Sequence, residues 1–218
     1  MSAASQQRRS DARRAAPELL TRRLRLRPWR RADEVVMAQI NADPEVTRHL
    51  SRPRTPVPAT AFYEIVTAHW EAHGFGFWAA EARTGERAGD LLGFIGLGYP
   101  TFIPVLATRV EIGWRLARHA WGRGLATEGA TAVRDHAVGD LQLPELISII
   151  HRENARSQRV AAKLGMTPTE RVVHPMSGTE VDVWTLTRPS AAQSQAPGAA
   201  ARGGAGAAPP RRARTAPR

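Results

Sequence analysis

The segment RHAWGRGLATEGA, residues 118–130, constrains the fold of this chain more than any other stretch, because two glycines stand where a helix begins. A glycine inside a helix costs about 1 kcal/mol relative to alanine. Gly122 and Gly124 therefore suit either a tight turn with left-handed backbone or a loop whose N–H groups approach an anion in front of a helix N-terminus. This segment alone leaves both explanations open.

A predicted strand and a predicted helix flank this loop, which favours anion binding. RVEIGWRL (109–116) alternates as a half-buried strand does, and a helix is predicted from about Ala126 to Ala137. A P-loop would need a lysine after its last glycine, whereas Leu125 follows Gly124. A dinucleotide-binding fold would need the loop after its first strand and an acidic residue about twenty positions on. Here the loop follows the fourth predicted strand.

The remaining pattern predicts one α/β domain over residues 21–188, in the order β-α-α-β-β-β-α-β-α-β-β. Alternating or β-branched stretches predict strands, and apolar residues at helical spacing predict helices. Asn154 can cap a helix by accepting a hydrogen bond from the N–H of Arg156 or Ser157, and Gly165 ends that helix. The expected strands are 21–28, 74–82, 91–99, 109–116, 143–151, 171–174 and 180–186, and the expected helices are 33–40, 59–73, 126–137 and 154–163.

Most of the net charge lies in the predicted tails. Of the net charge of +11, residues 1–20 contribute +2 and residues 189–218 contribute +5, which leaves +4 for residues 21–188. We expect a flexible basic arm over 1–20 and a disordered Ala/Gly/Pro/Arg tail over 189–218, which cannot bury a core. Such tails either contact nucleic acid or the ribosome without specificity or are solvated appendages.

All basic residues except Lys163 are arginine, which suggests a high-GC bacterial origin.

The absence of cysteine excludes disulfides, a thiol nucleophile and a thiolate metal site. The longest uncharged stretch, residues 91–108, approaches the length of a membrane span, but its three glycines and two prolines indicate strand and loop. The N-terminal arginines are not followed by an apolar run, so no signal peptide is predicted. We therefore expect a cytoplasmic protein without a membrane segment.

Two motifs together, EIGWRLARHAWGRGLATEG (111–129) and NARSQRVAAKLGM (154–166), resemble the GNAT N-acetyltransferases, specifically the RimJ/RimL-like branch. The segments LRLRPW and GFIGL occur in the same order, so the resemblance covers residues 21–188. It implies the GNAT fold, a mixed and mostly antiparallel sheet flanked by helices. It also implies acetyl-CoA as the co-substrate, no metal, and an amine as the acceptor.

The resemblance implies that the backbone amides of the glycine loop bind the pyrophosphate of acetyl-CoA. Trp121 replaces the Gln or Arg found in many members, so its contact is expected through backbone or packing. The strand before the loop matches positions whose backbone pairs with the pantetheine arm and polarises the thioester carbonyl. Asn154 is expected both to cap its helix and to contact the cofactor. The implied binding residues are Trp114, Arg115 and Leu116 in the strand, and Trp121, Gly122, Arg123, Gly124, Leu125 and Ala126 in the loop.

Many GNAT enzymes carry a tyrosine seven residues after the capping Asn, to protonate the leaving thiolate, but here that position is Ala161. Ser157 lies one turn earlier on the same helix face, and the resemblance to RimL-type enzymes gives it the donor role. The alternative is that Ser157 only completes the helix cap. Glu111 is the candidate base, acting directly or through a water, with a solvated or salt-bridged carboxylate as the alternative. Glu180 and Asp182 also stay open.

The other polar and aromatic side chains give weaker signals. Spacing assigns no role to His119, His136, His151 or His174. Tryptophans 29, 70 and 78 belong to the core or line an acceptor pocket, with the core favoured. The segments 51–58 and 100–108 are expected to shape that pocket, but their sequences do not indicate which acceptor it binds.

The acceptor is predicted from amine pKa values. A lysine amine with a pKa of about 10.4 is deprotonated about once in 2,500 at pH 7, whereas an α-amine with a pKa of about 7.7–8.0 is free about one time in five to ten. The sequence offers only weakly supported candidates for the catalytic base. We therefore predict transfer to a protein N-terminal α-amine by direct attack in a ternary complex. An aminoglycoside-like small-molecule amine acetyltransferase and a non-catalytic acyl-CoA-binding regulatory module stay open as alternatives, as does the oligomeric state.

Overall fold

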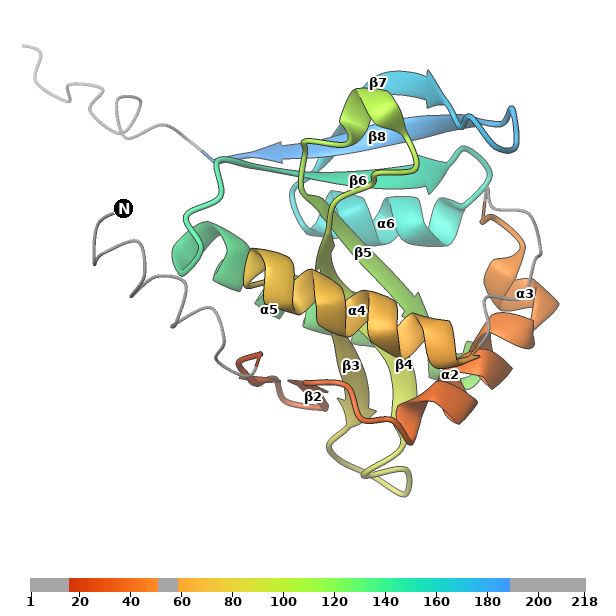
Figure 1. Ribbon diagram of the computed structural model, residues 1–218, viewed down its shortest axis with the longest axis vertical. Coiled ribbons are helices and arrows are strands. Elements are labelled where there is room, and N and C mark those ends of the chain that lie inside the picture. Colours follow the sequence, from red (N-terminus) through yellow and green to blue (C-terminus); the bar gives the residue numbers. More distant parts are fainter. Residues whose placement is uncertain (1–15, 51–58, 189–218) are drawn as a thin grey trace, which may run out of the picture. The chain divides into compact units, whose positions relative to one another are not determined.

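The computed structural model of the chain describes residues 16–50 and 59–188 (Figure 1). In these residues eight strands form one sheet in the order β1-β2-β3-β4-β5-β6-β8-β7. Every neighbouring pair of strands is antiparallel except β5 and β6. The predicted mixed, mostly antiparallel sheet flanked by helices is therefore confirmed.

The observed bounds of the long helices and strands lie close to the bounds that the sequence pattern predicts. The strands are β1 (Leu19–Leu20), β2 (Leu24–Arg27), β3 (Phe77–Ala82), β4 (Leu91–Gly98), β5 (Glu111–Leu116), β6 (Glu145–His151), β7 (Thr167–Val173) and β8 (Glu180–Thr187). The helices are α2 (Asp33–Ala42), α3 (Pro44–Thr47), α4 (Ala59–His73), α5 (Leu125–Gly139) and α6 (Ala155–Lys163), with 3-10 turns η1 (Pro104–Leu106) and η2 (Arg118–Ala120).

Several short elements differ from the sequence prediction. Strand β1 pairs Leu19 with Leu26 of β2, so the sheet begins before residue 21 and includes the last residues of the predicted basic arm. A separate helix α3 follows α2, because the Asp43 side chain accepts from the N–H of Glu45 and Pro44 occupies the first helical position. Strand β7 begins at Thr167, whereas the sequence pattern predicts a start at Arg171. The predicted loop 51–58, the arm up to residue 15 and the tail 189–218 lie outside the described residues.

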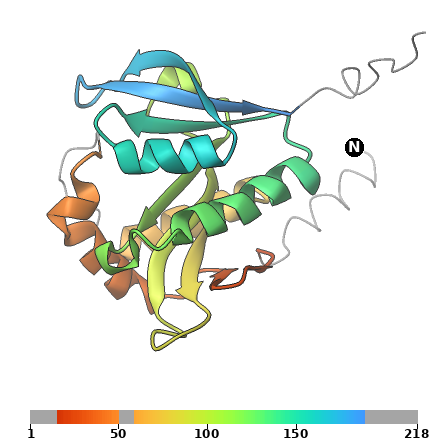
Figure 2. The same cartoon turned by 180° about the vertical axis from the view of Figure 1, so that it is seen from behind.

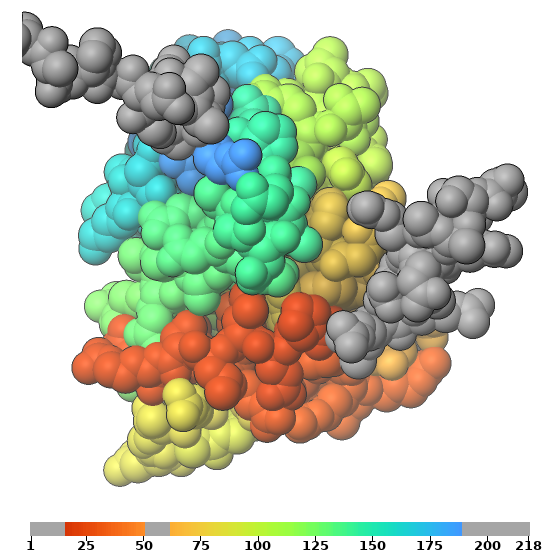
Figure 3. Space-filling view, turned by 90° about the vertical axis from the view of Figure 1, so that its left-hand side faces the viewer, coloured from red at the N-terminus to blue at the C-terminus, as the bar shows by residue number. Residues whose placement is uncertain are grey.

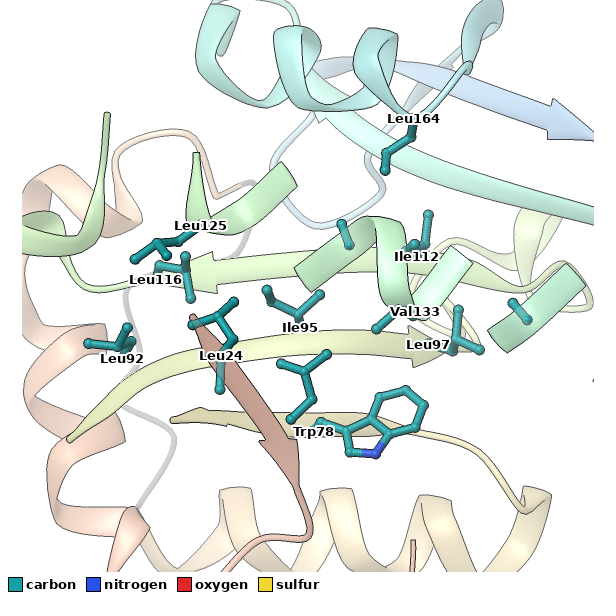
Figure 4. Close-up of a cluster of buried hydrophobic side chains, with 14 of the residues drawn as sticks. Leu24, Trp78, Leu92, Ile95, Leu97, Ile112, Leu116, Leu125, Val133 and Leu164 are labelled. Atoms are coloured by element: carbon teal, nitrogen blue, oxygen red, sulfur yellow. The ribbon is translucent and has the colours of Figure 1, made fainter. Parts of the chain in front are cut away.

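Helices cover both faces of the sheet. Helices α2 and α4 pack on one face, around Trp29, Met37 and Phe94. Helix α5 packs on the other face, where the side chains of Trp78 and Ile95 meet it (Figure 4). Figure 2 shows α5 and α6 together on the side of the sheet opposite α2 and α4. Among the described residues, no helix is both long and apolar enough to cross a membrane.

The sheet divides between β5 and β6. These two strands are in register at one pair only, Glu111 with Ile147, where the Ile147 N–H donates to the Val110 carbonyl at 2.9 Å. Beyond that pair β5 stays on β4 as far as Leu116, while β6 stays on β8 as far as His151. The two strands therefore diverge, as Figure 1 shows, and each leaves an unpaired inner edge.

Glu128 in the first turn of α5 ties that helix to the N-terminal strands. Its carboxylate accepts hydrogen bonds from the Thr21 hydroxyl at 2.6 Å and from the backbone N–H and Nε of Arg23, both at 2.7 Å. Figure 3 shows the N-terminal segment, in red, lying against α5, in green. These bonds hold the start of α5 in place and, with it, the glycine loop.

A buried cation joins β2 to α2 and β3. The Arg27 guanidinium, only 3% exposed, donates to both carboxylate oxygens of Asp33 at 2.8 and 2.9 Å and through Nε to Glu81 at 2.6 Å. Asp33 also accepts from the backbone N–H of Arg30 at 2.7 Å. Removing one member of such a buried ionic group leaves an uncompensated charge, which costs more than the group contributes when intact.

We therefore expect Arg27→Met to lower the free energy of unfolding by about 3–5 kcal/mol, because Asp33 stays buried without its cation and Glu81 keeps only the longer contacts to Arg25 and Arg30, at 3.7 and 3.5 Å. The control is Arg31→Met, since Arg31 and its partner Glu64 are 67% and 61% exposed. This control should change stability by about 1 kcal/mol or less. Urea denaturation of both variants measures the difference, and equal losses would show that the Arg27 group has no special role.

Candidate active site

A cavity of about 1620 Å³ opens where β5 and β6 diverge. The unpaired part of β5 forms one wall, and residues 148–151 of β6 form the opposite wall. The glycine loop and α6 line one end, which we call the donor half. Helix α4, the end of β4 and the segment after it line the other end, which we call the acceptor half. The predicted pocket segment 100–108 contributes Thr101, Phe102, Ala107 and Thr108 to the acceptor half.

The unpaired edge of β5 carries free backbone groups. The Val110 carbonyl accepts from β6, whereas the Ala117 N–H donates to Leu92 on the opposite side at 2.8 Å. Backbone groups alternate in direction along a strand, so the N–H and C=O of Trp114 and the N–H of Leu116 point toward the open edge. Both residues line the cavity. An extended ligand can therefore pair with β5 in the place that β6 has left.

The glycine loop has the conformation that its sequence required. Gly122 and Gly124 have φ values of +71° and +76°, and Gly124 is the N-cap of α5. No side chain among the described residues caps the helix, so the N–H groups of residues 125–127 keep their donor capacity. The loop and this first turn line the cavity. The turn explanation of the glycines is confirmed, and the same left-handed turn brings a helix N-terminus to the cavity, as anion binding would require.

A backbone cradle of this kind fits a diphosphate. A Cβ at Gly122 would meet no atom within 4 Å, so a bulky anion can approach its backbone. Three cations of α6, Arg156, Arg159 and Lys163, also line the cavity. The Arg123 side chain is exposed and is not among the cavity-lining residues, so its predicted contact with the cofactor depends on its backbone N–H alone.

Trp121, which stands where many GNAT sequences have Gln or Arg, contacts both strand β5 and helix α6 through its indole ring. Its indole Nε1 donates to the Leu116 carbonyl at 2.7 Å, where β5 ends. The Arg156 guanidinium of α6 lies 4.5 Å from the centre of its ring. Trp121 thereby connects the end of β5, the glycine loop and α6.

The predicted cap of α6 is confirmed, since the Asn154 side chain accepts from the Ser157 N–H at 3.1 Å. Both residues line the cavity. The Ser157 hydroxyl is hydrogen-bonded to no other residue in 16–50 or 59–188, and the cap uses only its backbone. Ala161, where many family members carry tyrosine, is fully buried in the core.

Glu111 lies at the one register pair of β5 and β6 and is half-buried in the cavity wall. Its Oε1 is 4.0 Å from the position that a Cβ on Gly113 would take, on the face of the sheet that the Phe77 ring also covers. The other two predicted acids are not among the described residues that line the cavity, and both are in ion pairs: Glu180 with Arg152 at 3.1 Å and Asp182 with Arg171 at 2.9 Å. The geometry therefore keeps Glu111 as the candidate base.

Comparison with protein families decides the identity of the fold. Residues 23–167, more than half of the chain, match the acetyltransferase (GNAT) domain family. The chain belongs to the GNAT acetyltransferase family. It is an acyltransferase by membership of that family, and the mixed sheet flanked by helices is the GNAT fold.

Similar proteins agree with this assignment. The chain is 30% identical over 166 residues to an FsC-acetyl coenzyme A-N(2)-transacetylase of Aspergillus fumigatus, covering 72% of this chain and 67% of that protein. An acetyltransferase structure from Agrobacterium tumefaciens matches with a TM-score of 0.67 and 30% identity, covering 80% of this chain and 96% of that one.

A structure of RimL, a ribosomal L7/L12 alpha-N-protein acetyltransferase in complex with coenzyme A, matches with a TM-score of 0.62. Its identity to this chain is 13%, with 80% of this acetyltransferase and 98% of RimL covered. At that identity the likeness shows the fold alone. The RimJ/RimL-like branch therefore stays a prediction.

The remaining aromatic predictions divide between core and cavity. Trp29 and Trp78 of the acetyltransferase are buried and Trp70 packs against the core, and none of the three lines the cavity, so the core interpretation is confirmed. His151 does line the cavity, with its ring 5.4 Å from that of His49. With Glu153 these two offer ligand atoms within 4.8 Å of one another, a grouping that could hold a metal ion.

Sequence spacing missed two residues of α4, His69 and His73, which line the acceptor half beside Tyr99. The His73 and Tyr99 rings are 4.9 Å apart, and those of His69 and His73 are 4.5 Å apart. The spacing of four residues on a helix was the available signal, but it does not show which face a helix turns to a cavity.

We expect Gly124→Glu to weaken acetyl-CoA binding by about 100-fold or more, because the new carboxylate occupies the anion cradle. The Arg23 guanidinium lies 3.6 Å from the position of the new Cβ, so the charge gains a partner and the fold should survive. The measurement is titration calorimetry with acetyl-CoA on the folded variant.

Gly85→Glu is the matched control for the acetyl-CoA titration. Gly85 also has positive φ (+83°), and nothing lies within 4 Å of an added Cβ, but it sits in the β3–β4 turn outside the cavity. Both variants carry the same backbone strain and the same new charge. If the two bind acetyl-CoA equally well, the glycine loop is not the phosphate site.

Proposed function

We propose that this GNAT acetyltransferase transfers the acetyl group of acetyl-CoA to a primary amine, specifically an α-amine, by direct attack in a ternary complex. The observation that carries the proposal is the unpaired edge of β5 beside the uncapped N-terminus of α5, both in one cavity. One end of that arrangement suits a diphosphate and the other an extended chain that pairs with a strand. Acetyl-CoA contains both features, because its diphosphate carries the extended pantetheine arm and that arm ends in the activated thioester.

Each binding residue has a distinct part in the proposal. The N–H groups of Gly124, Leu125 and Ala126 would hold the diphosphate, and Gly122 allows its approach. The backbone of Trp114 and Leu116 would pair with the pantetheine arm, and a free N–H on this edge would donate to the acyl oxygen as charge develops there. Asn154 would contact the donor from the start of α6. Much of the rate would come from holding two substrates in position.

Proton transfer would use Ser157 and Glu111. The Ser157 hydroxyl, which the helix cap leaves unused, would donate a proton to the departing thiolate. Glu111 would accept the proton of the attacking amine, directly or through a water. The chain contains no cysteine, which supports direct attack over an acyl-enzyme formed on a thiol.

The α-amine is favoured because a single half-buried carboxylate serves as base, and an α-amine is free far more often than a lysine amine at pH 7. RimL, which shares the fold, is named for the alpha-N position of a protein. A protein N-terminus is therefore our proposed acceptor, and the RimJ/RimL-like branch our proposed subgroup. The basic segments at both ends of the chain would add non-specific contact with RNA or the ribosome.

We expect Ser157→Ala to lower kcat by about 100-fold while the KM for acetyl-CoA changes by about twofold or less, since the donor acts only as the thiolate leaves. The Asn154 cap should survive, because it uses the backbone N–H of residue 157. Ser157→Thr retains a hydroxyl and should keep most of kcat. Steady-state thiol release measures both variants, and an unchanged kcat in Ser157→Ala would leave Ser157 with the capping role alone.

The acceptor proposal is tested with two matched peptides and acetyl-CoA. One has a free α-amine and no lysine, and the other has a blocked N-terminus and one lysine. We expect thiol release and a one-acetyl mass increase with the first peptide only. Acetylation of the lysine peptide alone would contradict the α-amine assignment. Acetyl-CoA binding without thiol release for any amine would instead indicate a non-catalytic binding module.

A further inference from the structure

Helix α4 turns one continuous face to the acceptor half of the cavity. The residues on this face recur at intervals of three and four positions, which places them on one side of a helix. None of them is a carboxylate, and Glu64, which follows Tyr63 on the same helix, pairs with Arg31 at 2.8 Å instead. The face consists of Phe62, Ile65, Val66, His69, Ala72 and His73, all of which line the cavity. We call it the α4 face.

Aromatic rings continue this apolar wall across the sheet. Phe94 of β4 lies 5.8 Å from Phe62 and 4.9 Å from Phe77, ring centre to ring centre. The Phe77 ring fits here because Gly98 and Gly113 have no side chains. A Cβ added at Gly98 would lie 3.0 Å from the ring, and one added at Gly113 would lie 3.3 Å from it. All of these rings line the same cavity, so the acceptor half is built to contact apolar and aromatic surface.

The apolar wall extends to the mouth of the cavity. Ile65 is 59% exposed and Leu50 is 38% exposed, although both are large apolar side chains. Both line the cavity rather than standing alone on the surface. Exposed apolar side chains that border a cavity mark a binding surface more often than isolated ones do.

Few negative charges face this space. Among the described residues, three acids line the cavity, and Glu111 is the one of these three that is not exposed. Glu45 lies 3.6 Å from Arg48, and Glu153 precedes Asn154 at the donor half. Arg115, which donates to Asn41 at 2.6 Å and lies over the Phe94 ring, adds positive charge to the wall. A ligand with several amino groups would therefore meet more positive than negative side chains among the described residues that line this cavity.

Building on the proposed function, we infer that the acceptor is a monoamine whose amino group is attached next to an aromatic or branched aliphatic group. The amino group lies toward Glu111, and the apolar group lies against the α4 face. Polycationic amines are poor acceptors. His69 fits this arrangement, because burial and the nearby charge of His73 lower its pKa to about 4, so its ring is neutral at pH 7 and does not repel an ammonium group.

His69 also supplies a polar contact within the apolar wall. Its Nε2 is buried and has no hydrogen-bond partner among the described residues. A neutral imidazole nitrogen in this position can pair with a polar group of the acceptor, such as the amide that follows an α-amine. The α4 face therefore recognises an apolar side group and offers one polar contact beside it.

The experiment compares four acceptors with the full chain and acetyl-CoA, read as thiol release. Phenylalaninamide and glycinamide differ only in the side group next to the α-amine, spermidine is the polycation, and a peptide that begins with Phe represents a protein N-terminus. We expect kcat/KM for phenylalaninamide to exceed that for glycinamide by 10-fold or more, a range typical of apolar pockets, about 10–200-fold. Spermidine should fall below glycinamide. The Phe peptide decides whether the apolar amine comes from a protein or a free metabolite.

A variant of the α4 face separates specificity from folding. Ile65→Asp places a carboxylate at an exposed position of the wall, so it should fold, and it should lower the phenylalaninamide-to-glycinamide ratio by about 10-fold. Val35→Asp is the matched control, because Val35 of α2 is similarly exposed (63%) and does not line this cavity. The control should leave the ratio unchanged.

The outcomes distinguish this inference from the function on which it rests. A ratio near one, or spermidine as the best acceptor, overturns the apolar monoamine and leaves acetyl transfer standing. An equal effect of Ile65→Asp and Val35→Asp overturns the role of the α4 face. Thiol release with none of the four amines, together with no binding of acetyl-CoA, overturns the proposed function itself.

Discussion

The separation of β5 from β6 after a single register pair is the constraint on which the whole site depends. Each strand is held firmly by its outer neighbour, β4 or β8, so the inner edges can part without loss of the sheet. Unpaired backbone groups inside a protein need a partner. Here the partner can be a ligand laid along β5, and the divergence also gives Glu111, at its vertex, access to the cavity. Pairing along the full length of both strands would close the site.

The start of α5 depends on contacts from three parts of the chain. Glu128 binds Thr21 and Arg23 from the N-terminal strands, Trp121 donates to the end of β5, and Arg156 of α6 lies over the Trp121 ring. A loop with two positive-φ glycines would be adaptable by itself. These contacts hold it in the one conformation that directs an uncapped helix N-terminus at the cavity, where the helix dipole favours an anion.

Specificity and chemistry occupy different elements in this arrangement. The backbone of β5 and the glycine loop are suited to a donor that many related enzymes share, and they demand little of particular side chains. The α4 face, the rings of β3 and β4 and the segment 100–108 line the acceptor half, where, in our proposal, side-chain identity decides which amine fits. Related folds can therefore keep one donor site while their acceptor walls differ.

The sequence by itself determined the long elements, the glycine loop, the Asn154 cap and the family resemblance, because each depends on local periodicity, left-handed glycines or a cap within a few residues. It also placed Glu111 and Ser157 on the correct elements. Only the tertiary structure decided that the Arg123 side chain is exposed and does not line the cavity, that Arg27 joins Asp33 and Glu81 in a buried ionic group, and that His69 faces Tyr99. Those outcomes depend on contacts between residues distant in the chain, which spacing along one element cannot reveal.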